Sequence, residues 1–433
     1  MRAPVLIAAF VAAVFAPLTL LASEPTVTAI RAGRLIDVKN DKVLTEQIIL
    51  VRGDRIERVG PARSVQIPSG ANVIDLSGYT VLPGLIDTHT HLMSDPTLPP
   101  YHGYGLSNPR LALKGAANAR ATLLAGITTV RDVGSPGFTD IALRDAIAAG
   151  EVPGPRILAS GPAIGITGGH CDDNMLAPEF DHYADGVADG VDGVRRAVRR
   201  NIKYGADVIK FCGTGGVFSK GTKVGAQQFT AEEMAALIDE AHMHGRKVAV
   251  HAHGADGIKT AIRAGVDTVE HASLIDDEGL ALAKKAGTYL SMDIYNTEYT
   301  QTEGPKRGEL EEFLRKDREI AQIQRDNFRK AVQAGIKIIM GTDTGVHRHG
   351  DSAKQLAFMV QYGMTPMQAI QAATSVAAEA LGLASEVGAI ASGHSADIIA
   401  VKGDPLSNIR LLESVEFVMK AGQVYKENGA NRI

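Results

Sequence analysis

The chain has 433 residues, of which 45% are hydrophobic and 22% are charged. This composition excludes a disordered or fibrous protein, and the length allows a large folded domain with a smaller one beside it. The 45 basic and 49 acidic residues are spread along the chain and give a formal net charge of -4, so no basic patch indicates nucleic-acid binding. A small molecule is therefore the expected substrate.

The first residues have the layout of a secretory signal peptide. Arg2 supplies a positive charge, an apolar run extends from Val5 to Leu21, and small residues around Ser23 follow. A retained membrane anchor is the alternative, but the apolar run is short for a bilayer span. We expect residues 1–23 to be removed on export, which leaves a periplasmic protein without stable membrane insertion.

Short β runs separated by turn residues occur at both ends of the mature chain. They are Val27–Ala32, Gln47–Val51 and Arg55–Val59 near the start, and Asp397–Val401 and Glu416–Met419 near the end. We expect the two ends to share one small β-sandwich domain, formed by residues 24–82 and 384–433.

Between these ends, short apolar strands alternate with longer Ala-rich helical patterns, which is typical of βα units around a parallel sheet. The expected strands are Leu85–Thr90, Thr128–Val133, Arg156–Ser160, Asp207–Phe211, Val248–His253, Thr268–His271, Thr288–Met292 and Lys337–Gly341. The expected helices include Leu111–Ala125, Val191–Tyr204, Ala231–His244, Ile258–Ala264 and Arg318–Ala334. The pattern predicts an α/β fold, a (β/α)₈ TIM barrel over residues 83–383.

Histidines and charged side chains fall at the carboxyl ends of these strands, where such barrels carry their active sites. His89 and His91 close the first strand, and alternate strand residues point to the same side, so both imidazoles can bind one cation. The other candidates at strand ends are Lys210, His251, His253, His271 and Asp343.

Together these motifs resemble the amidohydrolase superfamily over nearly the whole mature chain. They are Pro-Gly-Leu-Ile-Asp-Thr-His-Thr-His at residues 83–91, Lys210 in the fourth strand, His251 and His271 in the next two, and Gly-Thr-Asp ending at Asp343. In its binuclear members two divalent metal ions share one site. Zinc suits a set of histidines, one carboxylate and one carbamate.

The resemblance assigns each ligand to a position of this sequence. One metal would be held by His89, His91 and Asp343, the other by His251 and His271, and carboxylated Lys210 would bridge the two. An anionic bridge is needed because two nearby cations repel each other, and a carbamate supplies the charge that an ammonium cannot.

Catalytic and substrate-binding roles follow from the same resemblance. Asp343 would take a proton from the metal-bridging water as the hydroxide attacks the carbonyl, and then protonate the leaving amine. His253 shares the side of the strand with His251, so it is expected to polarise the carbonyl or bind the substrate, with a structural hydrogen bond as the alternative. His170 and His349 are further candidates for substrate binding, although His349 could instead cap the next helix.

Within the superfamily, Thr-Gly-Gly-His at residues 167–170, the Lys210 segment and His-Ala-His-Gly at residues 251–254 look most like the prolidase-like and ochratoxinase-like branch. Members of that branch resemble metallo-carboxypeptidases that release a C-terminal amino acid from a dipeptide or an N-acyl amino acid. The resemblance implies amide or peptide hydrolysis, with ochratoxin A as one candidate substrate. It also implies a homo-oligomer, for which the family suggests an octamer.

Two other activities of the superfamily stay open, a single-metal deaminase and a cyclic-amide hydrolase similar to imidazolonepropionase. Neither requires Lys210. Deaminases typically carry a catalytic glutamate near the strand-six histidine, whereas Glu270 precedes His271 directly and should point the other way by strand alternation. A non-enzymatic barrel is the third class, and the complete ligand set argues against it.

The two cysteines, Cys171 and Cys212, lie in segments expected near the active-site end of the fold. Export would permit a disulfide, but nothing in the sequence requires one. Two free buried thiols are the expectation, and their pairing is left open.

Overall fold

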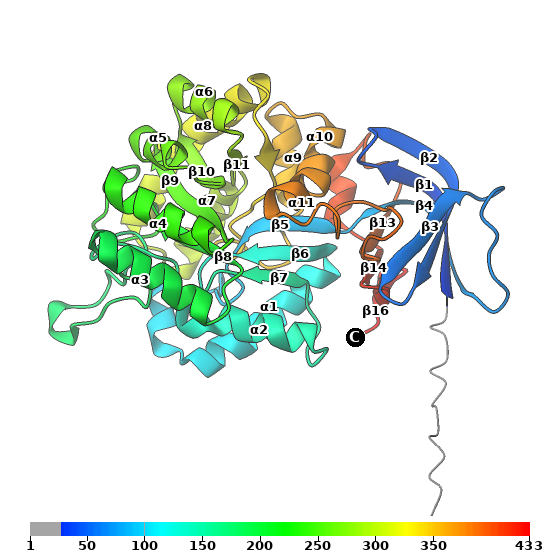
Figure 1. Cartoon of the computed structure of the whole chain (residues 1–433), viewed down its shortest axis with the longest axis horizontal. Helices are drawn as coiled ribbons and strands as arrows, with labels where there is room; N and C mark the ends of the chain where they lie inside the picture. The colour runs from blue at the N-terminus through cyan, green and yellow to red at the C-terminus, as the bar shows by residue number, and fades with distance from the viewer. Residues whose placement is uncertain (1–26, 99) are drawn as a thin grey trace, which may run out of the picture.

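The computed structural model describes residues 27–98 and 100–433. The signal peptide expected at residues 1–23 lies outside the described residues. Within the described ranges, no helix combines the length and the apolar character needed to cross a membrane. The chain forms a sheet built from its two ends and an α/β body beside it (Figure 1).

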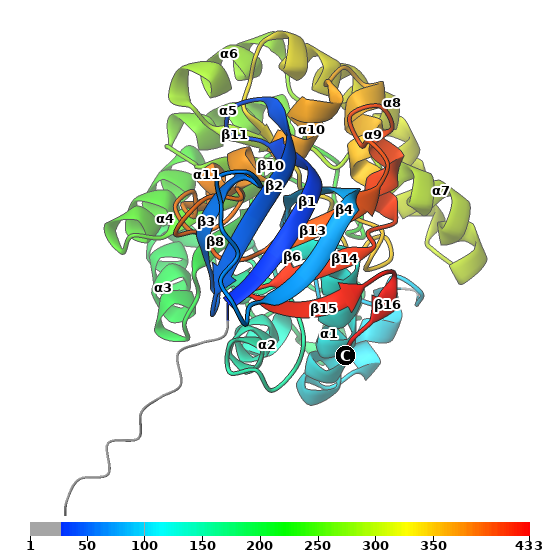
Figure 2. The ribbon, with the colours of Figure 1, turned by 90° about the vertical axis from the view of Figure 1, so that its right-hand side faces the viewer.

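The terminal sheet joins both ends of the chain, as predicted (Figure 2). Its strands, in spatial order, are β16 (Ala430–Asn431), β15 (Gln423–Glu427), β14 (Phe417–Lys420), β13 (Ile398–Lys402), β4 (Asn72–Pro83), β1 (Val27–Asp37), β2 (Lys42–Arg52) and β3 (Arg55–Pro61).

The pairing makes this one continuous eight-stranded sheet, so the expected sandwich of two sheets is supported only in part. The reason is β4, which the sequence pattern did not reveal as a strand. It pairs in parallel with β1, where Ile30 lies opposite Ile74, and antiparallel with β13, where Ile399 lies opposite Leu82. A single long strand thereby joins the N-terminal and C-terminal segments.

All eight strands predicted for the α/β body are present and lie in two parallel sheets. One contains β5 (Leu85–Thr90), β6 (Ile127–Asp132) and β7 (Arg156–Ala159). The other contains β8 (Val208–Cys212), β9 (Lys247–Gly254), β10 (Thr268–Leu274), β11 (Tyr289–Ser291) and β12 (Ile338–Ile339). Backbone hydrogen bonds connect the two sheets, from Thr88 N to Met340 O and from Ile164 N to Lys210 O, both at 2.9 Å.

The described helices of the body connect these strands. They are α1 (Asn108–Leu124), α2 (Thr139–Ala148), α3 (Gly190–Lys203), α4 (Ala231–Met243), α5 (Ala255–Arg263), α6 (Asp277–Ala286), α7 (Asn296–Arg307), α8 (Glu311–Gln333), α9 (Lys354–Gln361), α10 (Pro366–Ala372) and α11 (Ser375–Leu381). Helix α4 shows why the ends of a helix could be predicted from the sequence. Thr230 and Glu233 form a capping box at its start, and Gly245, at φ 67°, follows its end.

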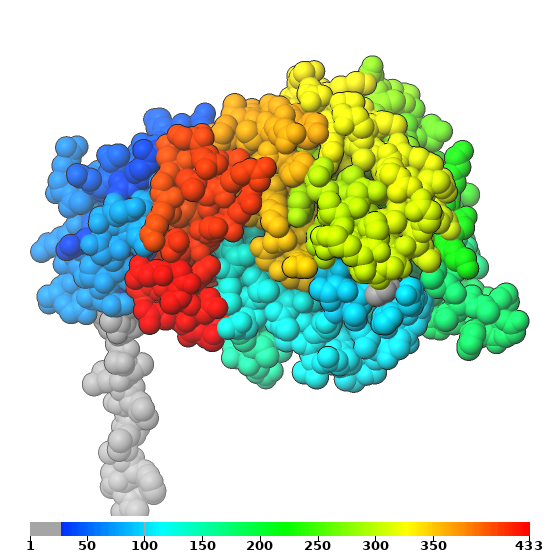
Figure 3. Space-filling view, turned by 180° about the vertical axis from the view of Figure 1, so that it is seen from behind, coloured from blue at the N-terminus to red at the C-terminus, as the bar shows by residue number. Residues whose placement is uncertain are grey.

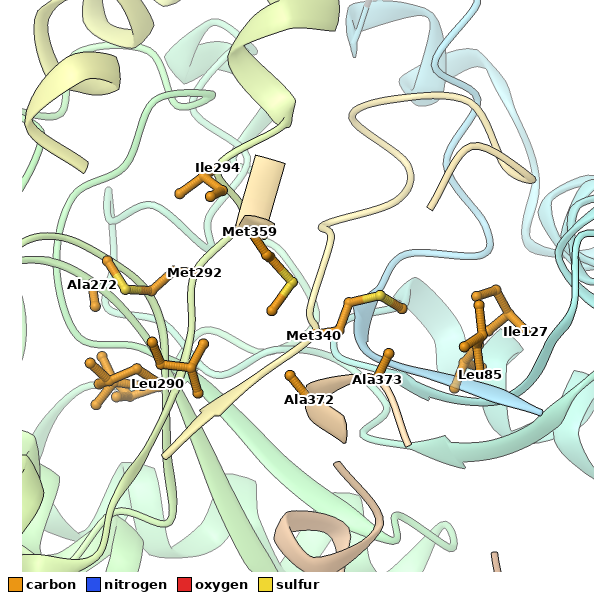
Figure 4. Packing of buried hydrophobic residues seen from close by; sticks show 14 of the residues in the cluster. Leu85, Ile127, Ala272, Leu290, Met292, Ile294, Met340, Met359, Ala372 and Ala373 are labelled. Carbon is orange, nitrogen blue, oxygen red and sulfur yellow. The ribbon is translucent and has the colours of Figure 1, made fainter. Parts of the chain in front are cut away.

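One large apolar core holds the strands, the helices and one face of the terminal sheet together. Leu85 of β5 and Ile127 of β6 lie in it with Met340 and Ala373, as Figure 4 shows. The C-terminal segment, red in Figure 3, lies between the N-terminal strands and the body. Burial of each large aliphatic side chain contributes about 1.5–3 kcal/mol, so the strand ends that carry the polar site rest on a close-packed support.

Candidate metal centre

The polar residues predicted from the strand ends converge on one buried site. Asp343 Oδ1 lies 3.4 Å from His89 Nε2 and 3.3 Å from His91 Nε2. Lys210 Nζ lies 3.5 Å from the same nitrogen of His89. The ligand atoms offered by His89, His91 and Asp343 all lie within 4.8 Å of one another. Four residues from three distant segments of the sequence thus share one small volume.

A second group of three histidines lies beside the first. His251, His253 and His271 offer ring nitrogens within 4.8 Å of one another, and the rings of His251 and His271 have centroids 4.4 Å apart. The ring of His271 lies 5.0 Å from that of His89, which joins the two groups. The side chains of the three histidines are nearly inaccessible to solvent.

Hydrogen bonds fix the orientation of these rings. His89 Nδ1 donates to Glu270, His271 Nδ1 donates to Asp293, and His91 Nδ1 donates to the carbonyl of Gly134, at 3.0, 2.9 and 3.1 Å. Each of these rings therefore keeps its Nε2 lone pair for a ligand.

The donor set fits divalent metal ions. His251 Nε2 is buried and has no hydrogen-bond partner among the described residues, which is costly unless another group satisfies it. Burial lowers the pKa of His89 to about 4 and the pKa of His251 well below its usual range, so both rings are neutral at neutral pH. Neutral imidazole is the form that binds metals, and the nearby carboxylate supplies negative charge.

Asp343 occupies the centre of the site in a left-handed backbone conformation, at φ 55°. Its Oδ2 accepts a hydrogen bond of 3.4 Å from Asn296 Nδ2, while its Oδ1 faces His89 and His91. Burial alone would raise the pKa of Asp343, but His89 and His91 outweigh burial and lower it. The carboxylate is therefore ionised at neutral pH.

Lys210 lies within β8 and is 3% exposed. Burial lowers the pKa of its amine to about 8, although Glu270 and Asp343 oppose the shift. More of this amine than of an ordinary lysine is thus uncharged near neutral pH, although the ammonium form still predominates, and the uncharged form is the one that can react with carbon dioxide.

The expected orientation of Glu270 is wrong. Strand alternation predicts that Glu270 and His271 point to opposite sides, but His271 and Ala272 have φ values of 70° and 48°, which break the alternation. Glu270 Oε2 therefore contacts His89 while His271 also reaches the site. The carboxylate is completely buried and held by Arg131, so it is not available to a substrate.

Sequence reasoning missed Asp293, although it follows the predicted strand ending at Met292. Its Oδ1 accepts from His271 and from Gln324 Nε2, both at 2.9 Å, and its Oδ2 accepts from Asn296 at 2.8 Å. The position of Asp293 directly after a predicted strand could have marked it as a site residue, as it did for the other strand-end residues. Asn296 connects this carboxylate to Asp343.

His170 and His253 border the site, and their expected roles toward the substrate stay predictions. The ring of His170 stacks on that of His251 with centroids 4.0 Å apart, and its Nδ1 is hydrogen-bonded to Ser219 at 2.8 Å. His253 Nδ1 is hydrogen-bonded to Ser273 at 2.8 Å. Both rings thus have one nitrogen held by the protein.

His349 is placed differently from the other predicted residues. Its Nε2 lies 3.1 Å from the carbonyl oxygen of Ser94, and its buried Nδ1 has no described partner. It belongs to none of the groups of metal-competent side chains among the described residues. Its expected role in substrate binding stays a prediction.

Cys171 and Cys212 form a disulfide, so the expectation of free thiols is wrong. The Cα atoms lie 5.9 Å apart, within the usual range for a disulfide. Cys171 follows His170 directly, and Cys212 lies two residues after Lys210. The bond therefore ties the loop carrying His170 to the strand carrying Lys210, a proximity that depends on how the loop folds.

We expect replacement of both cysteines by alanine to lower the free energy of unfolding and to loosen the His170 loop. A crosslink over 41 residues contributes about 4 kcal/mol in the chain-entropy model. Thermal unfolding with and without a reductant measures this, and the double variant is the control because a reductant should not change it. Two titratable thiols in the unreduced native protein would contradict the pairing.

Comparison with known proteins gives the same family. Residues 80–425 match the model of the Amidohydrolase family. The ochratoxinase of Aspergillus niger is 32% identical over 94% of this chain and 88% of its own length. A crystal structure of a Xaa-Pro dipeptidase with bound methionine is 40% identical, with a TM-score of 0.87 over 93% of this chain and all of the other. An imidazolonepropionase of Chromobacterium violaceum is 26% identical over 81% of this chain and 84% of its own. The chain belongs to the amidohydrolase family and is a metal-dependent hydrolase.

Proposed function

We propose that this enzyme releases a C-terminal amino acid from dipeptides or N-acyl amino acids by hydrolysis of the amide bond. The convergence of four histidines, Lys210 and Asp343 at the carboxyl ends of the parallel strands carries the proposal. The Xaa-Pro dipeptidase supports a dipeptide as substrate, and the similarity to ochratoxinase makes ochratoxin A a second candidate.

Two zinc ions are the proposed cofactors. His89, His91 and Asp343 would hold one and His251 and His271 the other, with Lys210 as the bridge after its neutral amine adds to carbon dioxide and releases a proton. When bound, such ions lower the pKa of water and polarise a carbonyl. The three hydrogen bonds that the Nδ1 atoms donate support this assignment, because they keep Nε2 of His89, His91 and His271 free.

Asp343 is the proposed proton carrier. Its Oδ2, which faces Asn296, accepts the proton of the attacking water and then delivers it to the leaving nitrogen as the bond to carbon breaks. The lowered pKa supports the role, since only the ionised carboxylate can accept a proton.

His170, His253 and His349 are the proposed substrate-binding side chains. The Ser219 and Ser273 hydroxyls orient the first two rings. Lys316, which is 3% exposed, donates to the Ser219 carbonyl at 2.6 Å and is ion-paired with Glu312 at 2.7 Å, so it holds the Ser219 segment beside His170 in place. A substrate carboxylate suits this side of the site, and His253 would face the carbonyl of the scissile bond.

The deaminase and imidazolonepropionase-like alternatives are less well supported. A deaminase needs an accessible glutamate beside the strand-six histidine, whereas Glu270 is buried and ion-paired. A single-metal reaction gives Lys210 no role as a metal ligand. Its burial would then be unexplained, because an unpaired buried amine is unfavourable.

A panel of paired substrates tests the proposal. We expect release of free amino acid from Xaa-Pro and other dipeptides, from N-acetylphenylalanine and from ochratoxin A. The matching C-terminal amides should react at least about 10²-fold more slowly, because an amide lacks the carboxylate and leaves buried polar groups of the recognition site unpaired. Equal rates on acids and amides, or turnover confined to imidazolonepropionate or a deamination substrate, would contradict it.

Further proposals concern the whole chain. The two parallel sheets, connected by the hydrogen bonds at Thr88 and Ile164, would form one closed (β/α)₈ barrel over residues 83–383, with residues 24–82 and 384–433 as the second domain. We also propose export to the periplasm after removal of residues 1–23, which the disulfide supports because such bonds persist in oxidising compartments. A homo-oligomer, and an octamer in particular, is proposed from family resemblance.

A further inference from the structure

A buried ion pair lies beneath the candidate metal centre and takes no part in the steps above. Arg131 of β6 and Glu270 of β10 are 1% and 0% exposed, and Arg131 Nη2 lies 2.6 Å from Glu270 Oε1. Burying two charges is unfavourable unless their geometry and remaining hydrogen bonds are good. A pair retained at this depth therefore calls for a function.

The guanidinium of Arg131 donates hydrogen bonds to groups on two other strands, β5 and β10. Its Nε donates to the Thr88 carbonyl of β5 at 2.6 Å, and its Nη1 donates to Thr268 Oγ1 of β10 at 3.0 Å. Arg131 thus connects the strand of His89 with the strand of His271. The carboxylate of Glu270 is fixed by this arrangement and cannot turn away.

The other oxygen of Glu270 sets the chemical form of His89. An ionised carboxylate only accepts hydrogen bonds, so the 3.0 Å contact with Oε2 requires the proton of His89 on Nδ1. The lone pair of His89 is then on Nε2, which faces Lys210 and Asp343. The left-handed conformations of His271 and Ala272 direct Glu270 inward, and non-glycine residues in that region are strained.

We propose that Arg131 and Glu270 are positioning residues that set the metal affinity of the site by holding His89 in its Nδ1-protonated form. The inference rests on the proposed function only in taking His89 as a metal ligand, and it does not depend on the substrate. Neither residue touches a reacting atom.

Glu270→Gln tests this. A glutamine has one accepting oxygen and one donating nitrogen, so it can satisfy Arg131 or the Nδ1 proton of His89, but not both. We expect the zinc affinity of one site to fall about 10–100-fold, as is typical when the partner of a ligating histidine is removed. Competition with a chelator measures the affinity, and the visible spectrum of the Co²⁺-loaded protein should shift.

Glu309→Gln is the matched control, since Glu309 forms another buried pair with Arg307, at 2.8 Å, outside the metal centre. It should lose stability while keeping metal affinity and the cobalt spectrum. If Glu270→Gln does not fold, Arg131→Met with Glu270→Met carries the test, because apolar pairs often replace buried ion pairs without loss of stability. Wild-type affinity for both zinc ions and an unchanged cobalt spectrum in Glu270→Gln, or in the Arg131→Met, Glu270→Met double variant that replaces it, would overturn the inference. Such a result would leave the substrate panel unaffected.

Discussion

Replacing Lys210 by alanine is expected to lower kcat/KM by roughly 10²–10³-fold or more, the effect of removing a group that stabilises charge in an active site. The wild-type protein should bind two zinc ions per chain and the variant no more than one tightly, because the cations lose the anionic bridge between them. The thermal unfolding temperature of the variant should stay close to that of the wild type, since a buried amine 3.5 Å from an imidazole stabilises the fold little. Metal analysis, steady-state kinetics and thermal unfolding together measure these effects.

Chemical rescue and a matched lysine sharpen this test. A small carboxylate such as acetate can enter the space left by the side chain and restore part of the charge, so it should recover part of the activity of Lys210→Ala only. Lys420→Met is the control, because burial also lowers the pKa of Lys420 to about 8, but its amine donates to the Gly154 carbonyl, away from the metal centre. Turnover retained in Lys210→Ala with both metals bound would show that Lys210 is not the bridge. A wild-type stoichiometry near one, with zinc and bicarbonate added, would contradict the two-metal proposal.

The sequence predicted the parts of the site that depend on the pattern of residues within a single strand. His89, His91, Lys210, His251 and His271 each follow from a strand pattern and a position at or near the strand end, and the structure brings them together. The eight strands of the body were also predicted, because short apolar runs indicate the strands and glycines end the helices between them, and neither signal requires knowledge of neighbouring strands.

What the sequence did not predict depends on contacts between distant segments. Strand β4 contains Gly78 and gains its partner β13 only from a segment more than 300 residues later. The disulfide depends on the path of the loop before Cys171, and the inward direction of Glu270 depends on two backbone angles that no periodicity encodes. Asp293 and Asn296 become part of the site only because β11 lies next to β10.

The pH dependence of Asp343 fixes the conditions for the second large effect. Its pKa is lowered from an ordinary value of 3.8, chiefly because His89 and His91 overcome the effect of burial. The carboxylate is thus ionised across the neutral range and can accept a proton there. Any loss of rate from its protonation must come as the pH falls below about 4. Between pH 5 and 8 the Asp343 contribution to kcat should be constant.

Asp343→Asn is expected to lower kcat by roughly 10²–10⁴-fold, the typical contribution of a general base, while KM changes much less. The amide keeps the shape of the side chain and one oxygen that faces His89 and His91, so the metals can stay bound, but it cannot accept the proton of water. Kinetics on a good amide substrate with parallel metal analysis measure this effect. Asp317→Asn is the control, because Asp317 is a buried carboxylate held by Gln301 and Thr297, and its replacement should leave kcat nearly unchanged.

If Asp343→Asn hydrolyses the amide at near the wild-type rate with both metals in place, another group takes the proton. His253 would then be the first residue to test, because its ring lies 4.7 Å from that of His271 and its Nδ1 is already held by Ser273.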